Sequence, residues 1–246
     1  MEVFILIQPL CEQTLQIYTS ENTCEKVCRL YKYSMRSIGK TFGNYLPTFC
    51  DHLLTAFTNQ QYSPFIYAAS ICVSEFGASN GLYDELLYRM LWGISQIFFQ
   101  KYQSLVDFEN APDVVEEYFH LLARYLDNCP TQLISSPQLG VLIEAGLTGL
   151  QLHHREATKG ILHFIEKFIA ATHLVSDTFK KAIEKMVVDM APRLLLILFK
   201  SLLLGELPSY VLHESSGSLC DVVWKMKQTF PNQLTVHTVG YLVYIY

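Results

Sequence analysis

The sequence predicts an all-α fold, an α-solenoid built of antiparallel helix pairs. Apolar residues recur with a period of about 3.6 along segments of roughly 15 to 20 residues, and no sustained alternation of apolar and polar residues between hairpin turns competes with that period. Half of the 246 residues are hydrophobic and 17% are charged, so the chain has enough apolar material for a core. The 12 glycines and 9 prolines fall mostly between the apolar segments, as expected where short turns join helices.

Ten helical segments are predicted along the chain. They cover residues 3–18, 22–38, 46–60, 63–77, 82–108, 111–130, 138–152, 153–173, 177–204 and 209–229. Asn22 or Thr23 is the expected N-cap of the second segment, because both side chains can accept a backbone hydrogen bond. Ser63 is the expected N-cap of the fourth, with Pro64 at the first helical position and Gly77 as its stop.

Similar helix starts recur near Asn22, Ser63, Pro112, His153 and Pro208. Their spacing is roughly 40 to 55 residues, close to that of helix-pair repeats such as HEAT and armadillo repeats. The long segment 82–108 accounts for one wide interval. We therefore expect about five to six HEAT-type pairs over residues 1–234. The tail 235–246 diverges from this pattern, since it favours a strand but has no partner strand. A compact all-α bundle is the alternative fold.

Cysteine usage and hydropathy bound the cellular setting. The seven cysteines are odd in number, and most of them lie in apolar helical patterns, where a free cysteine acts as a small hydrophobe. A reducing compartment, cytosol or nucleus, is expected. Residues 1–10 lack the features of a signal peptide. The apolar run 194–205 is broken by Lys200 and is too short for a bilayer, so we expect a soluble chain without membrane insertion. Its first residues already lie within an apolar pattern, which suggests a piece of a longer protein.

Motifs for catalysis or cofactor binding are missing from the sequence. It contains no G-x-S-x-G, P-loop or G-x-G-x-x-G. Cys24 and Cys28 lie one helical turn apart, but no further ligands at ordered spacing complete a zinc set, so core packing is predicted. The run His153–Glu156 fits a polar helix N-terminus better than a metal site, since no H-E-x-x-H is present. The sequence thus predicts a protein that is not an enzyme, with no metal site and no cofactor.

Positive charge is concentrated in one segment of this acidic chain, whose formal net charge is -5. Residues 22–40 contain a single acid, Glu25, and five bases. The five are Lys26, Arg29, Lys32, Arg36 and Lys40. At about 100° per residue they fall within an arc of about 120°, together with Tyr33 and opposite an apolar face. Because surface helices usually mix charges to gain i,i+4 pairs, the segment is either a solvated face or a site for an anionic partner. Phosphorylated peptide, acidic peptide and nucleic acid are the candidates, and the acidity of the whole chain disfavours direct nucleic-acid binding.

Five stretches, in order along the chain, resemble the importin-β (karyopherin) superfamily. They are VCRLYKYSMRSIGK (27–40), QQYSPFIYAASICVSEFG (60–77), APDVVEEYFHLLARYLDNCP (111–130), HREATKGILHFIEKFI (154–169) and LPSYVLHESSGSLCDVVWKM (207–226). They are most similar to the branch that imports serine/arginine-rich (SR) splicing factors into the nucleus. The resemblance implies HEAT repeats from the C-terminal half of a longer receptor that shuttles between cytoplasm and nucleus.

The resemblance also implies a cargo site. In this branch an arginine-rich helix binds the phosphorylated RS segment of the cargo. Its basic positions match Lys26, Arg29, Lys32 and Arg36, with Tyr33 and Lys40 as further candidates. The family has arginine at positions 26 and 32, and also where this chain has Asn22. Lysine keeps the charge but lacks the planar fork that binds phosphate through two hydrogen bonds.

Two further partners are implied by the same resemblance. RanGTP binds family members mainly through N-terminal repeats and releases the cargo, and nucleoporins carry the receptor through the nuclear pore. The alternatives are a related karyopherin with another cargo, or a HEAT scaffold without a role in transport.

Overall fold

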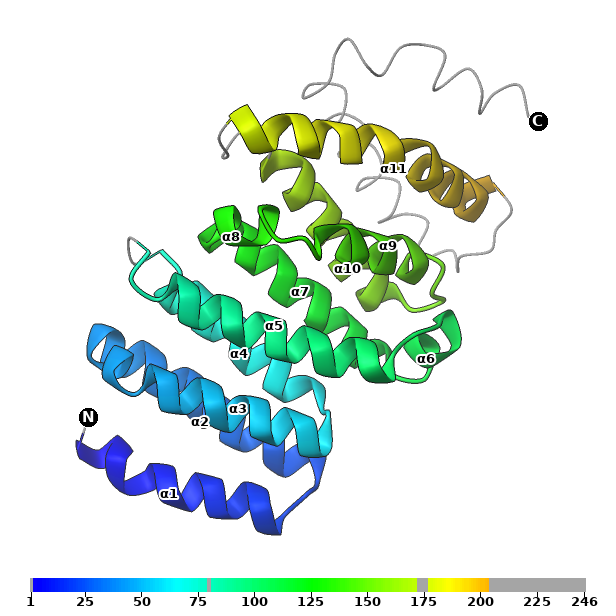
Figure 1. Cartoon of the computed structure of the whole chain (residues 1–246). Coiled ribbons are helices and arrows are strands. Elements are labelled where there is room, and N and C mark those ends of the chain that lie inside the picture. The colour runs from blue at the N-terminus through cyan, green and yellow to red at the C-terminus, as the bar shows by residue number, and fades with distance from the viewer. Residues whose placement is uncertain (1, 79–80, 172–176, 204–246) are drawn as a thin grey trace.

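The computed structural model describes residues 2–78, 81–171 and 177–203, which form eleven α-helices and one 3-10 helix. No strand occurs in these three ranges. The helices stack side by side in two layers, so the predicted all-α solenoid is confirmed and the compact bundle is wrong (Figure 1). The predicted segment 209–229 and the tail 235–246 lie outside the described residues, which leaves the boundary at residue 234 a prediction.

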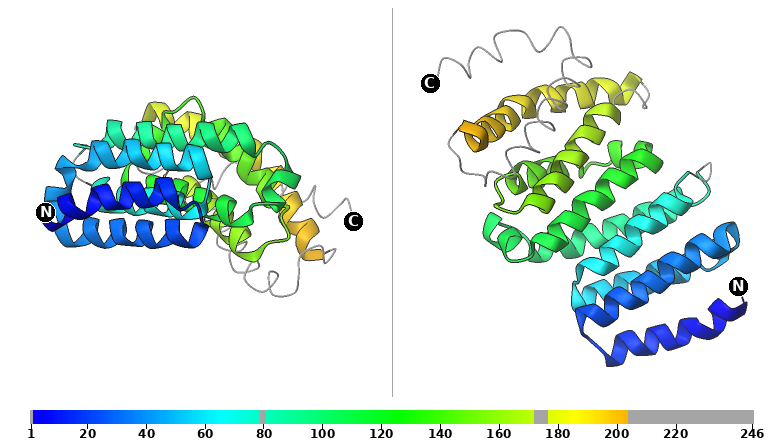
Figure 2. Two further views of the ribbon diagram at one scale, coloured as in Figure 1. Left: turned by 90° about the horizontal axis from the view of Figure 1, so that it is seen from below. Right: turned by 180° about the vertical axis from the view of Figure 1, so that it is seen from behind.

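One layer, which we call the α2 layer, contains every second long helix. Its members are α2 (Glu21–Ile38), α4 (Ser63–Phe76), α7 (Pro112–Asn128) and α10 (Arg155–Ala171). Within it, α4 packs between α2 and α7, and α7 packs between α4 and α10. Seen from behind, the α2 layer is nearest the viewer (Figure 2).

The other layer, the α1 layer, faces the viewer in Figure 1. It contains α1 (Glu2–Ile17), α3 (Leu46–Gln60), α5 (Asp84–Lys101), α9 (Leu139–Gly149) and α11 (Asp177–Leu203). Three short helices serve as connections between the layers. They are η1 (Gly39–Asn44), α6 (Leu105–Glu109) and α8 (Pro130–Ile134). The pairs α1–α2, α3–α4, α5–α7 and α9–α10 are the repeats of the solenoid.

The recurring starts predicted from the sequence mark a single layer. The helices nearest the first four predicted starts are α2, α4, α7 and α10, which begin at residues 21, 63, 112 and 155. Each helix pair has one helix in each layer, so helices one pair apart lie in the same layer. The spacing of starts found in the sequence is therefore the spacing of successive α2-layer helices. The fifth predicted start, Pro208, lies outside the described residues.

Two predicted N-caps are wrong. α2 begins one residue earlier than expected, at Glu21, and its N-cap is Ser20, whose hydroxyl accepts a hydrogen bond from the Thr23 amide at 3.4 Å. α4 has Tyr62 at the cap position without a side-chain hydrogen bond, and Ser63 is its first residue. Proline in the first turn supports that start without a cap, because the missing N–H there has no helical partner. The helix stops before Gly77, as predicted.

The predicted long segment 82–108 is two helices rather than one. α5 ends at Lys101, and α6 starts after Ser104, whose hydroxyl accepts from the Asp107 amide at 3.3 Å. The Asp107 carboxylate in turn accepts from the Ser104 amide at 2.9 Å, which completes a capping box. The apolar pattern continues across this break, but the capping box starts a new helix at Leu105. A prediction from apolar periodicity alone therefore misses the break.

Aromatic side chains join the two layers at the centre of the described region. Phe98 of α5 stacks on Tyr118 of α7 with ring centroids 4.0 Å apart. Tyr118 is fully buried, and its hydroxyl donates to Ser95 Oγ at 2.8 Å, while Ser95 Oγ donates to the Leu91 carbonyl at 2.8 Å. A buried hydroxyl costs stability unless it is hydrogen-bonded, so this chain satisfies both hydroxyls inside an apolar core.

Close approach of successive repeats requires glycine at the end of α4. A Cβ added to Gly77 would lie 2.7 Å from Cys129 Sγ and 2.8 Å from Asn128 Cβ, at the C-terminal end of α7. Both distances are shorter than contacts between real side chains. Gly77 therefore lets the C-terminal ends of two neighbouring α2-layer helices meet.

Candidate functional site

The structure places the predicted cargo residues on the exposed side of α2. Lys26, Arg29 and Arg36 are exposed and Lys32 is half-buried. The opposite side of the helix is the apolar core face. Its buried residues are Cys24, Val27, Cys28, Tyr31 and Met35. This division agrees with the predicted helical wheel for the first four basic positions.

Lys40 does not belong to the same helical face. α2 ends at Ile38, and Gly39 turns the backbone to φ 59°, so Lys40 lies in η1. Its side chain is exposed. The predicted continuous arc of five bases is thus reduced to four on α2, with Tyr33 exposed among them.

Both arginines already contact carboxylates. Arg29 forms an ion pair with Glu25, one turn earlier on α2, as the single expected i,i+4 pair. Arg36 Nε lies 3.0 Å from Glu75 Oε1 on α4, a contact between repeats that the sequence did not indicate. Lys26 and Lys40 have no ion pair within the described ranges. Phosphate at either arginine must therefore compete with a carboxylate.

Lys32 is held by an aromatic ring of the next repeat. Its ammonium donates to Tyr67 Oη at 2.8 Å and lies 5.2 Å from the centroid of that ring. The guanidinium of Arg124, on α7, lies 5.8 Å from the same centroid, and its Nη1 donates to Ser70 Oγ at 2.7 Å. Two cations thus contact the Tyr67 side chain, Lys32 at its hydroxyl and Arg124 near its ring.

A groove of about 640 Å³ opens beside these residues. α2 contributes one wall, α4 lies between α2 and α7, and α7 contributes a single residue, Glu117. We call it the α2–α4 groove. Its lining consists of Glu21, Asn22, Glu25, Cys28, Arg29, Lys32, Tyr33, Ser63, Pro64, Tyr67 and Glu117. The charged members are two bases and three acids, so the groove itself is not the uniformly basic surface that the wheel suggested.

Glu117 is the acid most affected by this environment. It is half-buried on α7, and burial raises its pKa to about 7, with the neighbouring Glu116 and Asp113 adding to the rise. The positive charge of Arg124 acts in the opposite direction. Within the described residues the Glu117 carboxylate makes no hydrogen bond or ion pair. It is available to a ligand in the groove.

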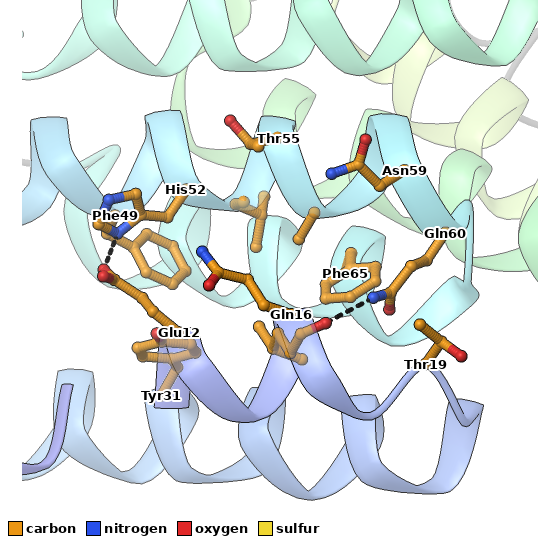
Figure 3. A pocket seen from close by; sticks show the side chains of 13 residues that line it. Glu12, Gln16, Thr19, Tyr31, Phe49, His52, Thr55, Asn59, Gln60 and Phe65 are labelled. Carbon is orange, nitrogen blue, oxygen red and sulfur yellow. Dashed lines mark hydrogen bonds and ion pairs between the residues drawn. The ribbon is translucent and has the colours of Figure 1, made fainter. Parts of the chain in front are cut away.

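A second pocket of about 360 Å³ lies between α1 and α3 (Figure 3). Its rim is polar, and the Glu12 carboxylate of α1 contacts the His52 ring of α3. Gln60 ties three helices together here, because its Nε2 donates to the Leu15 carbonyl at 2.8 Å and its Oε1 accepts from Cys24 Sγ at 2.8 Å. The contacts of Glu12, His52 and Gln60 thus link the first two repeats.

The cysteine and histidine candidates serve the fold. Cys24 and Cys28 are buried and free, as predicted, and burial raises the pKa of both thiols. His154 caps the start of α10, since its Nδ1 accepts from the Ala157 amide at 3.2 Å. Across the described ranges, no group of three or more His, Cys, Asp or Glu side chains could hold a metal ion. None of the helices in these ranges has the length and apolar character needed to cross a bilayer.

Comparison with known proteins finds similarity to transportin and importin-13 proteins. Residues 1–105, which contain α2 and α4, match the family model described as the Transportin-3/Importin-13 fourth TPR domain. Transportin MOS14 of Arabidopsis thaliana is 28% identical over 205 residues, which cover 80% of this chain and 20% of that protein. An uncharacterized Schizosaccharomyces pombe protein is 26% identical over 175 residues, 69% of this chain and 18% of that protein. The chain thus spans about a fifth of the length of these curated relatives. These similarities to transportin and importin-13 proteins agree with the predicted resemblance to the importin-β (karyopherin) superfamily.

Proposed function

We propose that this chain is the cargo-binding part of a nuclear import receptor similar to transportin-SR, and that it binds the phosphorylated RS segment of SR-type splicing factors. The observation that carries the proposal is the position of Lys26, Arg29, Lys32 and Arg36 on the open side of α2, beside the α2–α4 groove. The family supported by the comparisons makes a protein cargo the natural ligand for such a face.

The spacing of the cations suits a phosphorylated peptide. Arg29 and Arg36 are seven residues apart on α2, which is about 10 Å along the helix axis. Phosphoserines at alternate positions of an extended peptide lie about 7 Å apart along one edge. Two such phosphates therefore fit alongside the two arginines, with Lys32 between them. Lys26 and Lys40 extend the positive charge beyond either end of this contact, and Tyr33 lies next to it.

The existing ion pairs permit this exchange of partners. The side chains of Arg29 and Arg36 are 58% and 49% exposed, and exposed ion pairs contribute only about 0 to 1 kcal/mol. Phosphoserine carries a charge of about −1.5 to −2 at neutral pH, against −1 for a carboxylate. Phosphate therefore displaces Glu25 and Glu75, whereas an unphosphorylated serine gives no such gain. The predicted consequence is selectivity for the phosphorylated segment.

The remaining parts of the proposal concern the full-length protein. RanGTP releases the cargo in the nucleus, nucleoporins guide passage through the pore, and the receptor shuttles between the two compartments. The chain acts by binding alone, so the proposal includes no catalytic step and no cofactor.

Peptide binding tests the proposal directly. We expect the 246-residue chain to bind a fluorescent alternating arginine–phosphoserine peptide and to bind its unphosphorylated counterpart at least about tenfold more weakly. The double variant Arg29→Glu/Arg36→Glu should lose the phosphorylated peptide. A matched control is Lys181→Glu/Lys185→Glu, which reverses two exposed charges one turn apart on α11. Equal binding by the double variant and the control would rule out the assigned face.

A further inference from the structure

Acids line the α2–α4 groove together with the bases, and a ligand of phosphates alone does not account for them. Glu21 and Glu25 precede Arg29 on α2, and Glu117 faces the groove from α7. Acids in the first turns of α2 are expected, because they interact favourably with the helix dipole. Glu117 has no such explanation, since it lies in the second turn of another helix and is half-buried.

The position of Glu117 relative to the basic residues is the central observation. α4 packs between α2 and α7, so Glu117 approaches the groove from the side opposite Arg29. A partly desolvated carboxylate costs free energy unless a cation pairs with it. Arg124, the cation that lowers the pKa of Glu117, is occupied by Ser70 and the Tyr67 ring. A cationic side chain of a ligand would complete the pairing.

We infer that the α2–α4 groove binds a ligand of alternating charge, whose phosphates contact Arg29 and Lys32 while an arginine of the same segment contacts Glu117. Successive side chains of an extended peptide point to opposite sides. An alternating arginine–phosphoserine segment therefore has one anionic edge and one cationic edge. The groove offers a basic wall to the first edge and a carboxylate to the second. The inference rests on the proposed function and adds to it a role for the cargo arginines.

This arrangement makes a prediction opposite to that of a purely basic surface. Replacing each peptide arginine by citrulline removes its charge, keeps its shape and makes the peptide more negative. A basic surface would bind the citrulline–phosphoserine peptide more tightly than the arginine–phosphoserine peptide. A mixed-charge groove would bind it more weakly, because the pairing with Glu117 is lost.

Fluorescence anisotropy with these two peptides and three forms of the chain tests the inference. The parent chain should prefer the arginine peptide by about fivefold, the ratio expected for one partly exposed ion pair. Glu117→Gln, which is isosteric, should lose that preference by weakening the arginine peptide alone. Glu109→Gln is the control, because the Glu109 carboxylate is exposed on α6, does not line the groove and is not among the charges that shift the pKa of Glu117. It should keep the preference.

The outcomes separate this inference from the proposed function. If Glu117→Gln changes the binding of both peptides equally, or if the parent prefers citrulline, the role of Glu117 is wrong while phosphate binding by α2 stands. If Arg29→Glu/Arg36→Glu leaves both peptides bound as in the parent, the proposed function itself is wrong. Circular dichroism of each variant confirms that the helices are retained.

Discussion

Replacing Glu117 by glutamine should remove a pH dependence from the stability of the chain. Burial, Glu116 and Asp113 raise the pKa of this carboxyl group from 4.5 to about 7, and Arg124 only partly offsets them. Arg29 and Lys32 line the same groove from α2 but are not among the charges that shift this pKa. Because the folded protein holds the proton more tightly than the unfolded chain, ionisation of Glu117 favours unfolding.

The sign and size of the effect follow from this difference. The stabilising contribution of protonated Glu117 is fully present below about pH 4.5 and is lost as the pH rises toward about 7. A shift from 4.5 to about 7 corresponds to about 3.4 kcal/mol at 1.36 kcal/mol per pH unit. Glu117 is only half-buried and lines an open groove, so solvent screens the charge and we expect about 1 to 2 kcal/mol.

Urea unfolding followed by circular dichroism between pH 4.5 and pH 8 measures this difference. Glu117→Gln should match the parent chain near pH 4.5, where both side chains are neutral, and should be more stable by about 1 to 2 kcal/mol at pH 8. Glu109→Gln, at an exposed position on α6, controls for the loss of one charge. Parallel stability curves for Glu117→Gln and the parent over the whole range would refute the reasoning.

Three further substitutions test the packing and capping of the repeats. Gly77→Ala should destabilise the chain by about 1 to 3 kcal/mol, because the added methyl group meets Cys129; urea unfolding would show this, and an unchanged midpoint would contradict it. Tyr118→Phe should cost about 1 to 2 kcal/mol by removing the donor to buried Ser95, which the fall in melting temperature measures. Ser20→Ala should cost about 1 kcal/mol and speed amide hydrogen exchange in the first turn of α2, whereas unchanged exchange there would speak against the cap.

The sequence was sufficient for the architecture because the architecture depends on periodic burial. Apolar residues at helical spacing form the face that each helix buries, so the segments 46–60 and 63–77 match α3 and α4 within a residue. The predicted starts that recur once per helix pair turn out to lie in the α2 layer, although the sequence did not identify a layer. Each segment carries its own pattern of apolar residues, so one sequence is enough to show which face each helix buries.

The residues at which helices begin were harder to predict. Several neighbouring side chains can accept a hydrogen bond from the unpaired backbone amides of a helix's first turn. Ser20, Asn22 and Thr23 are all good N-caps, and the structure uses the first. The break after Lys101 depends on the capping box of α6, which competes with an unbroken apolar period. Choices of this kind are worth about 1 kcal/mol and are decided by packing beyond the segment.

The candidate site was predicted in part. A helical wheel is enough to place Arg29 and Arg36 on one side of α2, since it needs only the helix itself. The residues that complete the site come from the next two repeats. Glu75 lies 39 residues beyond Arg36, and Tyr67 lies 35 residues beyond Lys32. Glu117 lies 88 residues beyond Arg29. The signal that could have found them was the pair spacing, which predicts that α2, α4 and α7 are neighbours but not which of their faces meet.

Lysine at position 32 has a physical reason in this groove. The ammonium of Lys32 has three donors and uses one for the Tyr67 hydroxyl, so it can hold the ring and still donate to a phosphate. A guanidinium stacked on Tyr67 would compete with Arg124, which lies over the same ring. Lysine rather than arginine at position 32 therefore fits the contacts with Tyr67 of α4 and Arg124 of α7, although it lacks the planar fork of arginine. Under the proposed function, Arg29 and Arg36 exchange their exposed carboxylate partners for phosphate and supply the planar forks, while Lys32 supplies charge between them.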